Sequence, residues 1–179
     1  MASKSRLMMV ASSLVVGGLA LAGCAGQPGA AAVVDGRPIS EGYLAEAGAE
    51  FAPYSGSPLS PADMLTALIQ APVVVQVGSE HGVGVSTQEA VDRLDSVSET
   101  SQIATDGEYA DGTVQLVQMI LTYDALQNSP DSQAISEEVT ARIADTDVEI
   151  NPRYGQWDPK GTIVPVTPEW LIDSTPAAG

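Results

Sequence analysis

A charge-free apolar run near the start of the chain limits which residues can belong to a folded body. Residues 7–22 carry no charge and are rich in Leu, Val, Met and Ala, and Lys4 and Arg6 precede them. A helix needs about 20 residues to cross the hydrocarbon core of a bilayer. A basic start followed by a shorter apolar run is typical of a signal peptide. We therefore assign residues 1–23 to a leader that is removed from the mature protein.

The leader ends at the only cysteine of the chain, in the sequence Leu21-Ala22-Gly23-Cys24. This cluster resembles the signal of bacterial lipoproteins, in which a leucine and two small residues precede the cysteine. The resemblance implies that the Cys24 thiol accepts a lipid and that cleavage makes Cys24 the first residue. It also implies anchoring on the extracytoplasmic side of the cell membrane. The alternatives are an ordinary secretory signal with an incidental cysteine and a retained single-span anchor.

The composition of the remaining chain restricts its function. The chain has 179 residues, of which 44% are apolar, and this suffices for one domain with a hydrophobic core. Without Lys4 and Arg6 it keeps five basic against 23 acidic residues, a net charge of −18. Binding of nucleic-acid phosphates needs clustered Lys and Arg, so we exclude nucleic acid as a partner. One Cys and one His exclude an internal disulfide and the usual zinc-ligand spacings.

Helix start signals and apolar spacing predict a mainly helical body behind a short tether. Residues 24–32 have no charge and no large apolar side chain, which is typical of a flexible tether. Ser40, Ser60 and Ser86 each have the position of a helix N-cap. Helices are expected at residues 41–51, 61–80, 87–97, 113–127 and 131–144. Residues 99–112 are polar and predict a loop or a frayed helix.

Breaks in the pattern define the remaining elements. Pro72 lies inside the second expected helix and should kink or end it, so a strand at residues 73–77 is the alternative. Residues 33–34 predict a strand before a tight turn, and the alternation at residues 147–150 predicts another. We therefore expect one helical domain at residues 33–158, closed by two short strands. A Pro-rich tail at residues 159–179 is packed on it or irregular, with a strand at 163–166 as an option.

Three segments resemble the N-terminal chaperone domain of SurA and PrsA-type envelope foldases. Residues 31–40 (AAVVDGRPIS) are similar to the family's opening, residues 79–89 (SEHGVGVSTQE) to its step between helices, and residues 148–158 (VEINPRYGQWD) to the ending of actinobacterial lipoproteins with this domain. The resemblance implies that the first and last strands pair and hold a helical bundle. It implies binding of unfolded exported polypeptides. Because Ala144 and Asp147 are almost adjacent, no parvulin domain fits there, and we expect no prolyl isomerase activity.

Arg153, Tyr154 and Trp157 are the candidate residues for binding a partner. Arg can bind a carboxylate with two hydrogen bonds, and Tyr and Trp offer large contact areas. The structural alternative is that Arg153 pairs with one of the many acids while the aromatic rings pack the tail onto the helices.

No other residues form a recognisable catalytic or metal-binding set. His81 could be a base or a ligand, but no nucleophile motif or second ligand accompanies it, so a surface or capping role is the alternative. Two groups of acidic residues are expected to lie on the solvated surface. The first contains Asp106, Glu108 and Asp111, and the second contains Asp145, Asp147 and Glu149. We therefore expect no enzyme activity, no cofactor and no metal.

The resemblances together lead to two hypotheses. The first is a lipid-anchored protein of the cell envelope that binds unfolded or exported polypeptides in a chaperone-like manner. The second is a scaffold lipoprotein that docks one folded envelope partner through the aromatic, proline-rich segment after Pro152.

The lipid assignment is tested by Cys24→Ser. Because a thioether-linked lipid needs the thiol, we expect this variant to lose incorporation of a labelled fatty acid and to leave the membrane fraction. A variant that is still labelled would show that Cys24 is not the acceptor.

Overall fold

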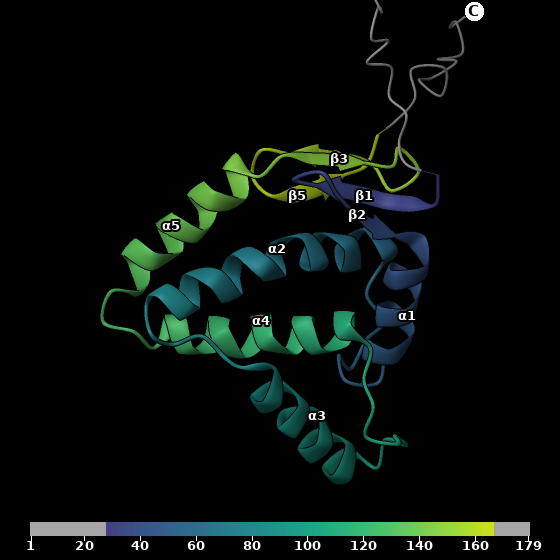
Figure 1. Cartoon of the computed structure of the whole chain (residues 1–179), viewed down its shortest axis with the longest axis vertical. Helices are drawn as coiled ribbons and strands as arrows, with labels where there is room; N and C mark the ends of the chain where they lie inside the picture. Colours follow the sequence, from purple (N-terminus) through teal and green to yellow (C-terminus); the bar gives the residue numbers. More distant parts are fainter. Residues whose placement is uncertain (1–27, 167–179) are drawn as a thin grey trace, which may run out of the picture.

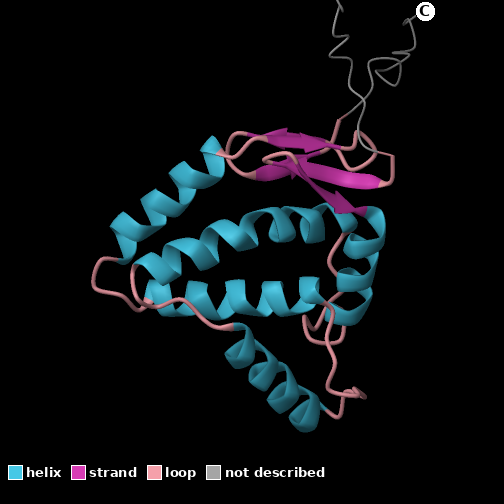
Figure 2. Cartoon of the chain, viewed as in Figure 1, coloured by secondary structure: helices cyan, strands magenta, loops and turns pink. Residues whose placement is uncertain are grey.

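The structure is a computed structural model that describes residues 28–166. Helices make up most of these residues (Figure 1). The described residues form five helices and two small antiparallel sheets, so the expected mainly helical fold is confirmed, and the sheets lie together on one side of the helices (Figure 2). The helices are α1 (Glu41–Phe51), α2 (Pro61–Glu80), α3 (Thr87–Ser101), α4 (Asp111–Gln127) and α5 (Ser132–Asp145). The strands are β1 (Ala30–Val34), β2 (Arg37–Ser40), β3 (Val148–Ile150), β4 (Gln156–Asp158) and β5 (Thr162–Val164).

The predicted first and last strands of the body pair with each other, as expected. β1 is the middle strand of a sheet with the order β2-β1-β3, and both pairings are antiparallel. Val33 lies opposite Glu149, and beyond the ladder the Asn151 N–H donates to the Ala31 carbonyl at 2.9 Å. Segments from the two ends of the body are therefore held together by backbone hydrogen bonds.

A third strand, β2, follows the predicted tight turn and joins this sheet, although the sequence analysis expects no strand there. The turn before it has Asp35 at φ 47° and Gly36 at φ 75°. Two successive left-handed residues form the tight turn that matches the twist of a hairpin, and Asp-Gly is a favoured pair there. Pro38 lies opposite Val33, one pair beyond the turn. This is a non-hydrogen-bonded position, so Pro38 costs no ladder bond and removes a donor from the exposed sheet edge.

The folded body begins earlier than expected, because the last three residues of the predicted tether at 24–32 belong to β1. Ala30, Ala31 and Ala32 form the first part of β1 and are buried in the core, with at most 7% exposure. Their small side chains fit where the strand lies close to the helices. A strand made of alanines has no large apolar residues, so the sequence pattern did not indicate it. Residues 1–23 and Cys24 lie outside the described residues.

The first part of the predicted tail is ordered against the helices. β4 and β5 pair antiparallel, so a strand forms at residues 162–164 within the tail. The Gln70 side chain of α2 donates to the Gly161 carbonyl at 2.7 Å in the turn between these strands. Residues 167–179 lie outside the described residues.

Serine side chains start three of the helices, as the sequence predicts. Ser40, Ser60 and Ser86 each accept the backbone N–H three residues later, at 3.0, 3.1 and 3.2 Å. At Ser86 the Glu89 carboxylate accepts the Ser86 N–H in return at 2.8 Å, which completes a capping box. Each cap satisfies a backbone donor that a helix start otherwise leaves free.

The structure resolves the alternative at Pro72, and it extends the third helix by one turn. α2 continues through Pro72 to Glu80, so the strand alternative at residues 73–77 is wrong. α3 runs to Ser101, beyond the expected end at residue 97, and stops at Gln102, which has a left-handed φ of 57°. The polar stretch after residue 99 therefore begins as helix and becomes a loop.

α2 is the helix around which the rest of the body packs (Figure 1). Its first half joins α1, α3, α4 and β1 in one apolar cluster, and its second half joins α4 and α5 in another. The face of α5 predicted from residues four apart, Ile135, Val139 and Ile143, lies in the second cluster. Within residues 28–166, α2 is the one helix long and apolar enough to cross a membrane, by length and composition only.

Gly78 allows the close contact between α2 and α4. A Cβ at this position would lie 2.2 Å from the Thr122 Cγ2 atom, well inside van der Waals contact. Thr122 is itself fully buried, so neither helix has room to move away without opening the core.

Pro72 lies inside α2, and its side chain is exposed. Pro72→Ala should raise the free energy of unfolding by about 2 kcal/mol, because alanine restores the N–H and removes the ring that crowds the preceding turn. Urea denaturation measures the change. Pro61→Ala is the control, since a proline at the first helical position loses no helix bond, and this variant should not be stabilised.

Candidate functional site

A groove of about 650 Å³, lined by both apolar and polar side chains, lies where the β1–β2 hairpin meets α2, and we call it the hairpin groove. Its apolar lining comes from Val34, Pro38, Ile39, Ile69, Pro72 and Val73. Tyr43 of α1 and Gln115 of α4 lie at the side where the first core cluster begins, and the Tyr43 hydroxyl donates to the Gln115 side chain at 3.4 Å. Segments from five elements, β1, β2, α1, α2 and α4, therefore meet at one surface depression.

The groove depends on how the chain turns before α1. The tight turn at Asp35-Gly36 returns β2 along β1, and Ser40 then caps α1. The hairpin is thereby held beside the middle of α2, where Pro72 is exposed and Val73 is half-buried. These side chains remain partly open because no described element covers them from outside.

One end of the groove is acidic. A smaller depression of about 270 Å³ continues from it and shares Asp35, Val73, Gln76 and Thr146 with it. This end also contains Asp145, the last residue of α5. The Asp35 carboxylate accepts the Asp147 N–H at 3.1 Å, so its position is fixed by the strand opposite.

Arg153 and Tyr154, two of the predicted partner-binding residues, lie together at a different pocket. This pocket of about 300 Å³ lies between α1 and the start of α2. The Arg153 guanidinium donates to the Glu41 carboxylate at 2.8 Å and lies 5.1 Å from the centre of the Tyr154 ring. The Arg153 side chain is 60% exposed, so this ion pair is mostly solvated and contributes little to stability.

Trp157, the third predicted residue, does not join them. It lies in β4 and is half-buried against both apolar clusters of the body. Tyr154 also packs against the first cluster. The structure thus pairs Arg153 with an acid and packs both aromatic rings onto the helices, as the structural alternative expects, while Arg153 and Tyr154 remain at the rim of a pocket.

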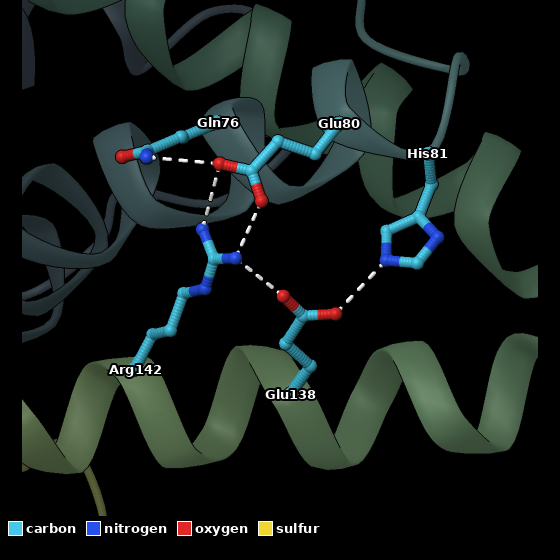
Figure 3. Close-up of polar contacts among 5 residues, drawn as sticks. All are labelled: Gln76, Glu80, His81, Glu138 and Arg142. Atoms are coloured by element: carbon cyan, nitrogen blue, oxygen red, sulfur yellow. Dashed lines mark hydrogen bonds and ion pairs between the residues drawn. The ribbon is translucent and has the colours of Figure 1, made fainter.

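His81 belongs to a chain of polar contacts between α2 and α5 (Figure 3). His81 Nε2 shares a hydrogen bond with the Glu138 carboxylate at 2.9 Å. Arg142 binds both Glu80 and Glu138, and the Gln76 amide donates to Glu80 at 3.0 Å. His81 follows the last residue of α2 as its cap, which agrees with the surface or capping role. The network ties the second half of α2 to α5.

Charge pairing shifts the acidity of the groups in this network. Hydrogen bonds from Arg142 and then from Gln76 lower the pKa of Glu80 to about 2. The hydrogen bond from His81, followed by the charge of Arg142, lowers the pKa of Glu138. The Glu80 hydrogen bond raises the pKa of Arg142. These groups therefore stay ionised at neutral pH, as expected for a structural ion-pair network.

The acidic groups of the sequence lie on the surface. Asp145, Asp147 and Glu149 are exposed, as predicted. Asp106 accepts the N–H of Glu108 at 3.1 Å in an exposed loop turn. Within residues 28–166, no group of three or more His, Cys, Asp and Glu side chains is arranged to hold a metal ion.

The network predicts a measurable change at Glu80. Arg142→Gln should move the pKa of the Glu80 carboxyl from about 2 towards its ordinary value of 4.5, followed by NMR titration. Since the folded-state pKa is lowered, the contribution to stability is present above pH 4.5 and is lost as the pH falls through about 2. The stability difference between wild type and variant should therefore shrink over that range. Arg93→Gln on α3 should leave Glu80 unchanged, and a Glu80 pKa unaffected by Arg142→Gln would contradict the assignment.

Comparison with protein-family models, with curated proteins and with solved structures finds no match to this chain. The case for a function therefore depends on the residues themselves. Two of the surface depressions on the described chain combine with the residues discussed above: the hairpin groove with its acidic end, and the pocket that carries Arg153 and Tyr154.

Proposed function

We propose that this protein is a lipid-anchored component of the cell envelope that binds unfolded or exported polypeptides in a chaperone-like manner, without catalysis. The observation that carries the proposal is the hairpin groove, a depression of about 650 Å³ that is open to solvent and exposes a set of apolar side chains between polar ones. Small ligand sites are lined mainly by apolar groups, and apolar surface left open on a protein commonly marks an interaction site.

The groove suits extended polypeptide. Pro38, Pro72 and Val73 offer an uncharged apolar lining that accepts side chains of different shapes. Each buried aliphatic side chain gains roughly 2 kcal/mol, which the ordering of the bound chain partly offsets. Weak and reversible binding follows, and this allows a bound chain to leave and fold.

The strand pairing supports the resemblance to the SurA and PrsA-type chaperone domain. That resemblance implies that strands from the two ends of the domain pair, and β1 and β3 do so. Assignment to that family and its client binding remain part of the proposal. Absence of isomerase activity is proposed from the direct connection between α5 and β3.

The proposed anchor would hold the groove close to the membrane. Ala30, where β1 begins, lies six positions after Cys24, and six extended steps span at most about 21 Å. Since β1 also contributes Val34 to the groove, an exported chain that emerges from the membrane would meet the groove nearby.

The chaperone-like activity is tested with the lipid-free body and an unfolded model protein that aggregates. The body should slow aggregation, measured by light scattering, at near-stoichiometric ratio. Val73→Gln should remove most of this effect, because it places an amide in the groove lining. The matched control is Ile120→Gln, since Ile120 is a similarly large apolar residue that is 42% exposed on α4 and does not line the groove.

Folding of both variants is checked by circular dichroism before the comparison. Equal activity of Val73→Gln and wild type would contradict binding in the hairpin groove. Lack of any effect of the wild type on aggregation would contradict the chaperone-like function itself. If the wild type has no effect on aggregation but cross-linking recovers one folded partner, this pair of results would instead support the scaffold hypothesis.

A further inference from the structure

The hairpin groove is chemically different at its two ends. At the α1 side its polar residues are neutral, with Tyr43 hydrogen-bonded to Gln115. At the α5 side it continues past Asp35 to Asp145. A ligand that fills the groove therefore passes from a mixed apolar and polar surface to an acidic one.

The charges at the acidic end are not cancelled by neighbouring cations. Arg142 reaches this end, but Glu80 and Glu138 both bind it. No ion pair within 4.0 Å joins Asp35 or Asp145 to a basic side chain of the described chain. Arg37, which none of these ion pairs includes, also lines the hairpin groove, but it does not line the smaller depression that contains Asp145. That depression holds Asp35 and Asp145 against Arg142 alone, and because two carboxylates already bind Arg142, the local charge there is negative.

The position of Asp145 is unfavourable for its own helix. It is the last residue of α5, and the C-terminus of a helix carries the negative end of the helix dipole. A carboxylate there is repelled instead of being stabilised. The same arrangement, a carboxylate added to a negative helix end, attracts a cation on a ligand.

Other occupants fit this surface less well. A second copy of the chain carries the same strongly negative charge, so approach of two bodies is opposed. The chain's own residues 167–179 contain the apolar run Trp170-Leu171-Ile172, but Glu169 and Asp173 flank it. Both have the same sign of charge as the acidic end of the groove.

We propose that the hairpin groove selects polypeptide segments in which an apolar stretch is followed or preceded by Lys or Arg, with the basic side chain placed between Asp35 and Asp145. This inference rests on the proposed function, because it names the class of segment that the same groove binds. Selection by charge adds specificity to an apolar contact that accepts many side chains.

Fluorescence anisotropy of labelled peptides tests the selection. Three peptides share an apolar core of four Leu and Val residues and are flanked on both sides by Lys, by Gln or by Glu. The Lys peptide should bind at least about tenfold more tightly than the Glu peptide at low salt, with the Gln peptide between them, and added salt should reduce the difference.

The variants distinguish a local site from the overall charge of the protein. Asp145→Asn, alone and together with Asp35→Asn, should reduce the ratio of Lys-peptide to Gln-peptide affinity several-fold, and both changes keep the size of the side chain. Asn also suits the hairpin turn at position 35. Glu99→Gln is the matched control, because it removes one exposed charge from α3, which lies away from the sheet in Figure 1. It should leave the ratio nearly unchanged.

The outcomes separate the inference from the proposed function. If the three peptides bind equally and Val73→Gln abolishes binding, the groove binds polypeptide and the charge selection is wrong. If Asp145→Asn and Glu99→Gln reduce the ratio equally, the attraction belongs to the whole protein, which also overturns the inference. Binding of none of the peptides overturns both. Self-association that Val73→Gln abolishes would assign the groove to a second copy and overturn the inference as well.

Discussion

The pairing of β1 with β3 is the contact on which the rest of the structure depends. It joins the start of the body to the segment after α5, and it places Ala31 and Ala32 in the main apolar cluster. Two short strands could not form a stable sheet alone, so the ladder is stable only because one face packs on helices. In return, the ladder fixes where the hairpin and α5 lie relative to α2. The groove exists because these positions are fixed together.

Local signals in the sequence were sufficient for most of the helices. The serine caps and the apolar spacing on α5 act over three or four residues, so they can be read without knowing the fold. The Glu138–Arg142 pair has the same short spacing and could have been predicted from it. β2 was missed although its Asp-Gly turn was recognised, because a proline in a four-residue strand argues against a strand unless its pairing position is known.

The candidate site was the least predictable part, since its residues come together only through the fold. Val34, Pro72 and Thr146 line one groove, but no spacing in the sequence relates them. The ion pair between Arg142 and Glu80 also joins residues that no spacing in the sequence relates. Sequence reasoning selected Arg153, Tyr154 and Trp157 by residue type, and residue type cannot tell a packed aromatic ring such as Trp157 from an exposed one.

The distribution of cations makes the acidic surface more than a matter of composition. Arg142 and Arg153 are each held by carboxylates, so two of the few basic groups serve the fold and leave the remaining acids less neutralised. Salt largely screens the interaction between surface charges that are more than about 10 Å apart, so a ligand interacts mainly with the carboxylates beside it. At the hairpin groove these are Asp35, fixed by the β3 side of the sheet, and Asp145, at the end of α5. The same ladder and network that close the bundle therefore also set the charge that a bound chain would meet.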